Sequence, residues 1–121
     1  MIYTHTIKVK PLSVNLAWQG QRFKTPAYKQ YERALLFLLP TVKLPIADRY
    51  DVLYEFGFSN IASDLDNPAK LITDILQKKY MFNDKKIFKM TITKNIVSKG
   101  REYIGITIRP FDNSVSQTEL L

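Results

Sequence analysis

The fold of this chain is decided by residues 51–80, which read DVLYEFGFSNIASDLDNPAKLITDILQKKY. Aromatic and aliphatic side chains occupy every second position from 52 to 58, and this alternation predicts a half-buried β-strand. Asn67-Pro68 then predicts the start of a helix, because Asn is a good N-cap and Pro fits the first helical position. Apolar residues recur at helical spacing from there to about Tyr80. The stretch therefore predicts a strand, a loop and an amphipathic helix.

The segments on either side extend this pattern. A first strand is expected over residues 2–10, and a long polar loop then leads to a helix over about 27–39. Beyond residue 80, two alternating segments around 88–92 and 104–108 flank the turn residues Ser98-Lys99-Gly100. This arrangement predicts a C-terminal β-hairpin.

These elements predict one α+β domain over residues 1–110, with a mixed sheet of about four strands and two helices packed on it. Residues 111–121 have no clear pattern and are expected to form a tail. No apolar run approaches the roughly 18 residues of a membrane span, so no membrane partner is expected. The chain has no cysteine, which excludes disulfides, thiolate zinc sites and a cysteine nucleophile, and is compatible with the cytoplasm.

The charge distribution is the first functional observation. Eighteen Lys and Arg residues against eleven Asp and Glu residues give a formal net charge of +7. Residues 85–101 hold no acid, and we call this segment the basic stripe after its Lys85, Lys86, Lys89, Lys94, Lys99 and Arg101. Such a stripe is typical of a polyanion-binding surface. A solvated, lysine-rich hairpin is the alternative interpretation.

Three aspartates stand out against this basic background. Asp64 and Asp66 are two residues apart, so in an extended segment their carboxylates point the same way, about 7 Å apart. Asp84 comes directly before the basic stripe. Oxygen ligands without cysteine favour Mg²⁺ or Mn²⁺ over zinc, and carboxylates among cations suit a metal that acts on a phosphate backbone. Lys70, one turn into the predicted helix, is suited to stabilise charge on the scissile phosphate.

The same residues have structural interpretations, which stay open at this point. Asp66-Asn67-Pro68 is also an ordinary helix start, and Asn83-Asp84 is a common turn pair. Lys70 and Asp74 are spaced as an i,i+4 ion pair on the helix surface.

Other polar and aromatic residues are interpreted mainly as structural. His5, the single histidine, lies in the first strand without a nucleophile motif beside it. Trp18 is expected to anchor the long loop to the core rather than to stack on a base. Phe37 lies opposite the main apolar side of the first helix, so the end of that helix is apolar nearly all round and suggests a contact with a partner.

The motifs together resemble a known family. The run Asp64-Leu65-Asp66-Asn67-Pro68-Ala69-Lys70, followed by Asp74-Ile75-Leu76 and Phe82-Asn83-Asp84, resembles the core signature of the RusA family of Holliday junction resolvases. The opening Pro11-Leu12-Ser13-Val14-Asn15 is also similar to that family, and the resemblance covers about residues 1–110. Two positions differ, because residues 60–63 lack the arginines of some members and Tyr80-Met81 stands where members often have Gly.

The resemblance implies a small, cytoplasmic, homodimeric endonuclease of bacterial or prophage origin, active in recombination and repair. Such a protein binds four-way DNA junctions and nicks two strands symmetrically with Mg²⁺ or Mn²⁺. The resemblance assigns metal binding and catalysis to Asp64, Asp66 and Asp84, and makes Lys70 the catalytic lysine. The expected DNA-binding residues are Asn15, Arg22, Lys24, Lys29, Lys85, Lys86 and Lys89. The alternatives are a non-catalytic basic DNA-binding module of the same fold and a small basic interaction protein.

The length of the second helix sets a geometric condition on this site. A helix over residues 67–80 rises about 20 Å, whereas the four steps from Tyr80 to Asp84 span at most about 14 Å. Asp84 therefore approaches Asp64 and Asp66 only if the helix ends early, if the chain doubles straight back, or if a two-fold dimer supplies Asp84 from its other subunit. The sequence leaves these solutions open, and we expect the three carboxylates to share a metal in the dimer.

Overall fold

The computed structural model describes residues 2–12, 18–19, 23–63, 65 and 67–112, with the backbone alone at residues 18, 19, 23 and 67. In chain order the elements are β1 (Tyr3–Ile7), β2 (Trp18–Gln19), β3 (Phe23–Lys24), α2 (Pro26–Leu38), β4 (Tyr50–Phe58), α3 (Asn67–Tyr80), the 3₁₀ turn η1 (Asp84–Lys86), β5 (Ile87–Ile96) and β6 (Tyr103–Pro110). The main helices and strands lie within a few residues of the expected ranges, and α3 ends at Tyr80 as predicted.

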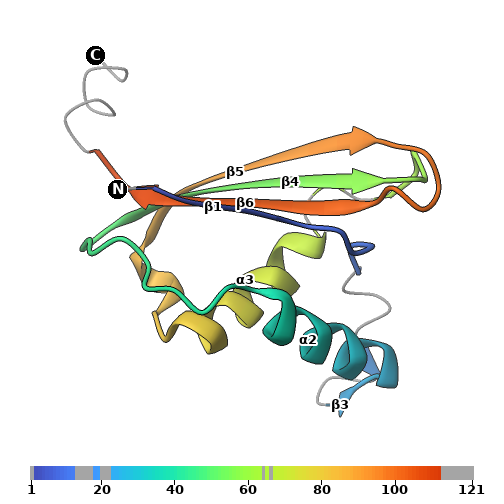
Figure 1. Ribbon diagram of the computed structural model, residues 1–121, viewed down its shortest axis with the longest axis horizontal. Helices are drawn as coiled ribbons and strands as arrows, with labels where there is room; N and C mark the ends of the chain where they lie inside the picture. Colours follow the sequence, from blue (N-terminus) through green and yellow to red (C-terminus); the bar gives the residue numbers. More distant parts are fainter. Residues whose placement is uncertain (1, 13–17, 20–22, 64, 66, 113–121) are drawn as a thin grey trace.

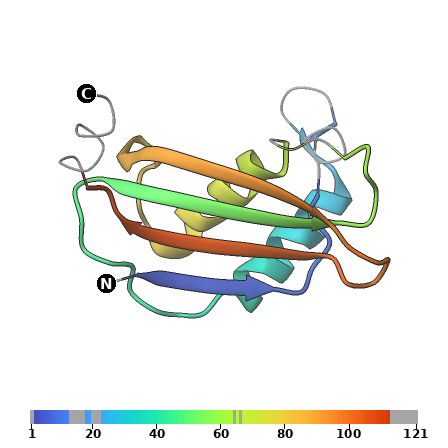
Figure 2. The same cartoon turned by 90° about the horizontal axis from the view of Figure 1, so that it is seen from above.

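A four-stranded mixed sheet forms one layer, and both helices cross the same face of it (Figures 1 and 2). The strand order is β1-β6-β4-β5. Strand β4 runs parallel to β5 and antiparallel to β6, which in turn is antiparallel to β1. The predicted α+β class, with a mixed sheet of four strands and two helices, is therefore confirmed.

The predicted C-terminal hairpin is wrong. Strands β5 and β6 follow each other in the chain, but β4 lies between them and pairs with both. The alternating pattern identified two strands and a turn correctly, yet it carries no information about which strands are neighbours. In strand β4 eight of the nine residues are at least half-buried, and seven of them are fully buried. Only a position between two other strands covers a strand to this extent, and β4 takes that central place. The segment β4-α3-β5 is consequently a parallel βαβ unit.

The core lies between this sheet and the two helices. Tyr54 and Phe56 of β4 are fully buried, as the alternation predicted, and they face the apolar side of α3. The Tyr54 hydroxyl and the Thr73 hydroxyl are 2.7 Å apart, and Thr73 donates to the carbonyl of Ala69 at 2.7 Å. Tyr54 is therefore the donor to Thr73, and this chain of hydrogen bonds fixes α3 on the central strand.

Helix α2 starts one residue before the expected range, at Pro26. The Thr25 hydroxyl caps it by accepting from the Tyr28 amide at 3.2 Å, and Pro26 takes the first helical position. At the other end Phe37 remains 85% exposed, which agrees with the expectation of an apolar surface there. A search of the described residues finds no helix that is long and apolar enough to cross a membrane.

Candidate active-site groove

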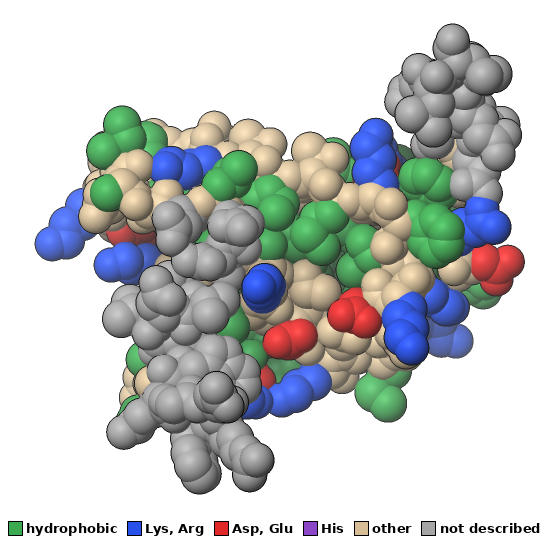
Figure 3. Space-filling view, turned by 180° about the vertical axis from the view of Figure 1, so that it is seen from behind, with side chains coloured by type: hydrophobic (Ala, Val, Ile, Leu, Met, Phe, Trp, Pro, Cys, Tyr) green, Lys and Arg blue, Asp and Glu red, His purple; other side chains and the backbone are tan. Residues whose placement is uncertain are grey.

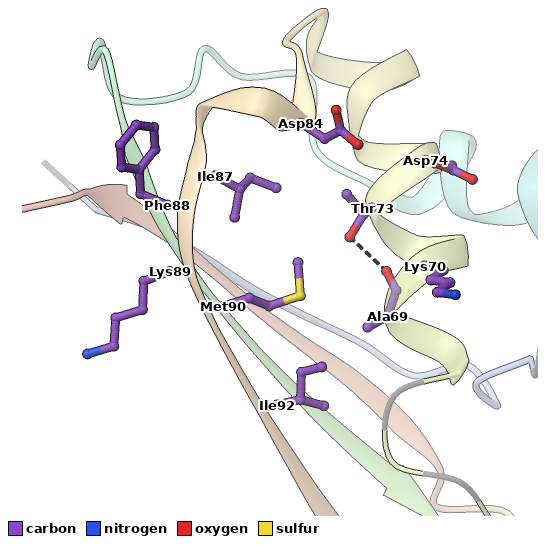
Figure 4. Close-up of a pocket in the computed structure, with 10 residues that line it drawn as sticks. All are labelled: Ala69, Lys70, Thr73, Asp74, Asp84, Ile87, Phe88, Lys89, Met90 and Ile92. Atoms are coloured by element: carbon purple, nitrogen blue, oxygen red, sulfur yellow. Dashed lines mark hydrogen bonds between the residues drawn. The ribbon is translucent and has the colours of Figure 1, made fainter.

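A groove of about 620 Å³ runs between α3 and β5. We call it the α3–β5 groove, and it is lined by Ala69, Lys70, Thr73, Asp74, Asp84, Ile87, Phe88, Lys89, Met90 and Ile92. Figure 4 shows Ile87, Met90 and Ile92 pointing from β5 toward the helix, so the floor is apolar, while Asp84 lies at one end of the groove and Lys89 points away from α3. On this side of the molecule, hydrophobic side chains form a band beside acidic and basic ones (Figure 3).

Phe88 departs from the predicted alternation of β5. A register shift between Tyr50 and Asp51 places Ile87 opposite Tyr50 and Lys89 opposite Asp51, which leaves Phe88 without a partner on β4. In Figure 4 Phe88 points away from α3, and it is 56% exposed against Phe111 and Arg49. The bulge thus turns the Phe88 side chain away from α3.

Asp84 reaches the groove because the chain reverses sharply after α3. Met81 adopts a left-handed backbone conformation with φ of 57°, and its amide donates to the carbonyl of Gln77 at 2.9 Å. The chain then runs back along the helix, and the Asp84 amide donates to the Gln77 side-chain oxygen at 3.0 Å. The chain thus doubles back after α3, and the approach of Asp84 to Asp64 and Asp66, which lie outside the described residues, stays a prediction.

Asp74 is a member of the groove that the sequence did not single out as functional. It lies on α3, and its side chain accepts a long hydrogen bond of 3.5 Å from the Gln77 amide group. Partial burial and the nearby Asp84 carboxylate raise the pKa of Asp74, while Lys24 and Lys78 lower it. The two carboxylates are thus close enough for their charges to repel. The sequence signals were the position of Asp74 one turn after Lys70 and its place in the Asp74-Ile75-Leu76 part of the family signature, to which no role was assigned.

Lys70 lies on the exposed side of α3, one turn before Asp74, and lines the groove with Asp84. The three ion pairs formed by described residues do not include Lys70, so the i,i+4 pair with Asp74 is not present. Among the described residues, no acidic side chain pairs with its ammonium group. Lys70 and Asp84, fourteen positions apart in the chain, are therefore brought to one cavity.

Asp64 and Asp66 lie outside the described residues. The loop before them is described up to Ser63, whose amide donates to the carbonyl of Asn60 at 3.1 Å. The described residues contain no group of three His, Cys, Asp or Glu side chains that would hold a metal ion. Two of the three predicted ligands are outside that search, and the third, Asp84, is an exposed carboxylate in the groove that fits a hard divalent cation.

The sequence itself matches a known family over this region. A family model described as endodeoxyribonuclease RusA matches residues 8–109, which include both walls of the groove and the whole D-x-D-N-x-x-K run. The chain belongs to the RusA endodeoxyribonuclease family. A comparison with curated proteins finds none that matches this chain.

Membership of the RusA family makes this chain an endodeoxyribonuclease of the kind that resolves Holliday junctions, and junction DNA is its binding partner. The family resemblance of the motifs is therefore confirmed. The matched range also agrees with the expected extent of the resemblance, about residues 1–110.

The expected DNA-binding residues of this RusA protein fall into three groups. Lys29, Lys85, Lys86 and Lys89 are exposed. Lys24 is more enclosed, because its ammonium pairs with Glu32 at 3.0 Å and lies over the Tyr28 ring. Asn15 and Arg22 lie outside the described residues, as does the Trp18 side chain. His5 lies half-buried in β1, the edge strand opposite β5.

Proposed function

We propose that this RusA protein resolves four-way junctions by paired, symmetric nicks that depend on Mg²⁺ or Mn²⁺. One observation carries the proposal: Lys70 and Asp84 line the same groove, and the D-x-D pair directly precedes the helix that forms one wall of it. Carboxylates and a free ammonium around one groove are the groups that phosphodiester hydrolysis needs.

In this proposal Asp64, Asp66 and Asp84 would hold a divalent ion, which would supply Lewis-acid activation of the attacking water and would offset charge on the leaving oxygen. The Lys70 ammonium contacts the scissile phosphate and stabilises the negative charge that develops there. Exposed lysines next to Asp84, namely Lys85, Lys86 and Lys89, bind phosphates on either side of the cut. The apolar floor of the groove excludes water from this contact and strengthens it.

The proposed active form is a homodimer. A four-way junction presents two equivalent strands related by a two-fold axis, and two sites with the same symmetry nick both strands. The exposed apolar end of α2, with Phe37 85% and Leu38 44% exposed, supports a contact with a second subunit. A molar mass of two chains in light scattering is the expected result.

The central experiment compares Asp66→Asn and Asp84→Asn on a labelled synthetic junction with and without Mg²⁺. Each substitution removes a metal-binding charge but keeps the side-chain volume, so cleavage is expected to fall at least about a hundredfold while junction binding persists. Asp48→Asn is the matched control, because Asp48 is an exposed aspartate that does not line the groove. Cleavage at the wild-type rate by Asp66→Asn refutes the metal assignment, and a wild-type protein that binds but never nicks supports the non-catalytic module.

Mixing the two inactive variants tests which subunit supplies Asp84. If Asp84 completes the site of its own chain, both sites of a mixed dimer carry one defect and no activity returns. If Asp84 acts across the dimer, one site of the mixed dimer carries both defects and the other is intact. Recovery of single-strand nicking after mixing therefore identifies the second arrangement.

A further inference from the structure

One cation of the basic stripe has a different environment from the rest. The ammonium of Lys94 donates to the carbonyl of Ile61 at 2.8 Å and to the carbonyl of Ser63 at 2.7 Å. Both acceptors belong to the loop that follows β4, more than thirty positions earlier in the chain. Two of the three ammonium donors are thus used within the protein.

The direction of the Lys94 side chain follows from the register of β5. Lys94 pairs with Phe56 of β4, a fully buried residue, and it lies two and four positions after Ile92 and Met90. Since side chains two apart share a face of a strand, Lys94 lies on the side that faces the helices. Lys89, which in Figure 4 points away from α3, lies on the other side.

The loop held by Lys94 leads directly into the D-x-D pair. Ser63, whose carbonyl it binds, is followed immediately by Asp64, and α3 begins three residues later at Asn67. The loop is also closed on itself, because the Asn60 side chain accepts from the Ala62 amide at 3.0 Å and the Asn60 carbonyl accepts from the Ser63 amide. The chain that carries Asp64 and Asp66 is therefore anchored at one end by Lys94 and at the other by α3.

We propose that Lys94 is a positioning residue for the metal-binding carboxylates, rather than a phosphate contact. This inference rests on the proposed function. By holding the carbonyls of Ile61 and Ser63, Lys94 fixes the backbone that leads into Asp64 and so favours the placement of the metal ligands. Its loss is expected to weaken metal binding and to leave junction binding intact.

The first test is a Mg²⁺ titration of junction cleavage by Lys94→Met, with Lys89→Met as the matched control. Loss of a residue that orients ligands lowers metal affinity about tenfold or more, so the half-saturating Mg²⁺ concentration is expected to rise by about that factor in Lys94→Met. Lys89→Met is expected to keep the wild-type Mg²⁺ midpoint and to weaken junction binding. Lys94→Arg, which retains a donor and a charge, is expected to restore part of the metal affinity.

Junction affinity in Ca²⁺ or in the absence of metal separates positioning from phosphate contact. The salt dependence of binding is expected to be the same for Lys94→Met and wild type, because no phosphate contact is lost. If Lys94→Met instead lowers the salt slope by about one and keeps the Mg²⁺ midpoint, Lys94 is a phosphate contact and the inference is wrong.

Hydrogen exchange of the free protein tests the contact without any activity. The amides of Ala62 and Ser63 are expected to exchange faster in Lys94→Met than in wild type, since the loop that contains their hydrogen bonds loses its anchor. Unchanged exchange overturns the inference. A wild-type protein that shows no Mg²⁺-dependent nicking overturns the proposed function, and the exchange result then still reports on the contact itself.

Discussion

Met81 carries a backbone conformation that its side chain disfavours. It takes the left-handed position directly after α3, where Gly is the usual residue, and its own side chain is 86% exposed. The reversal that brings Asp84 beside Gln77 begins at this residue. The protein thus makes the turn required by its groove without the residue that makes such a turn easily.

Met81→Gly is expected to stabilise the protein. The left-handed conformation costs a residue with a Cβ about 1 kcal/mol relative to Gly, and the exposed Met81 side chain contributes little packing in return. The free energy of unfolding, measured with urea, is expected to rise by about 0.5–1 kcal/mol. Lys79→Gly, inside the same helix, is the contrasting control and is expected to destabilise. A loss of stability in Met81→Gly contradicts this account.

Asp74 makes stability depend on pH. Its pKa is raised in the folded state by partial burial and by Asp84, so the folded protein holds its proton more tightly than the unfolded chain does. Stability is therefore lost as the pH rises from the unfolded pKa through the folded pKa. Because Asp74 is exposed and screened by solvent, Asp74→Asn is expected to gain only about a few tenths of a kcal/mol at pH 7 and nothing at pH 3. Urea unfolding at the two pH values measures the difference, and an equal gain at both contradicts it.

Individual residues were predicted well only where the signal was local. The Asn67-Pro68 start and the end at Tyr80 were found because caps and periodicity act over a few residues. The hydrogen bonds of Lys94 to the loop before Asp64, and the charge repulsion between Asp74 and Asp84, involve segments that only the folded chain brings together. The sequence shows that Lys94, Asp74 and Asp84 are charged, but it does not show which residues they interact with in the folded protein.

Among the elements, α2, α3 and the short β2–β3 ribbon meet at one acidic residue. Glu32 of α2 accepts from Lys24 at 3.0 Å and from Lys78 at 2.9 Å, and its side chain is only 17% exposed. Burial alone raises the pKa of Glu32, but the hydrogen bonds from Lys78 and Lys24 outweigh it and lower that pKa below its usual value. The two helices are thereby linked outside the apolar core.

Glu32→Gln is expected to lower the free energy of unfolding by about 1 kcal/mol at pH 7, the scale of a partly enclosed ion-pair network. The folded pKa of Glu32 is depressed, so its contribution is present above the unfolded pKa and disappears as the pH falls through the folded pKa. At pH 3 the variant and wild type are expected to unfold at the same urea concentration. A difference that is independent of pH assigns the effect to packing.

The pairing of β4 with β6 requires a glycine at one cross-strand pair. Gly57 lies opposite Tyr103, and a Cβ on Gly57 meets the Tyr103 ring. The ring is held there because its hydroxyl donates to Glu55 at 2.8 Å and accepts from Asn95 at 2.8 Å. Two residues, Glu55 of β4 and Asn95 of β5, thus hold the Tyr103 ring of β6 in place.

Gly57→Ala is expected to cost about 1–3 kcal/mol of stability, because the ring must move and its hydrogen bonds are lost. The double variant Gly57→Ala with Tyr103→Ala is expected to be no less stable than Tyr103→Ala alone, since the clash is then absent. Thermal unfolding of the four proteins measures this coupling. Additive losses in the double variant contradict the proposed clash.

At the scale of the whole molecule, the exposed lysines predict how junction binding responds to salt. Junction affinity is expected to fall by orders of magnitude between about 50 and 200 mM salt, because each phosphate contact releases counterions. Lys29→Met and Lys85→Met are each expected to reduce the slope of log affinity against log salt by about one. Lys43→Met, an exposed lysine outside the predicted set, is the control and is expected to leave the slope unchanged.

The architecture was predictable in class but not in strand order. Alternation in β4 and β6 and the periodicity of α3 predicted the layers, because each pattern reports which side of an element is buried. The insertion of β4 between β5 and β6 was missed, because a turn after β5 is equally compatible with a hairpin and with a crossover to the far side of β4. The function was inferred from the family match, because neither the strand alternation nor the helical periodicity indicates an activity.

The strand order also determines when this protein completes its fold during synthesis. Strand β1 is made first, yet its only neighbour in the sheet is β6, which is about a hundred residues later in the chain. A nascent chain therefore keeps its first strand without its β6 partner until residues 103–110 have left the ribosome. Truncation before residue 103 removes the strand that joins β1 to β4, so the sheet then cannot reach its observed order β1-β6-β4-β5.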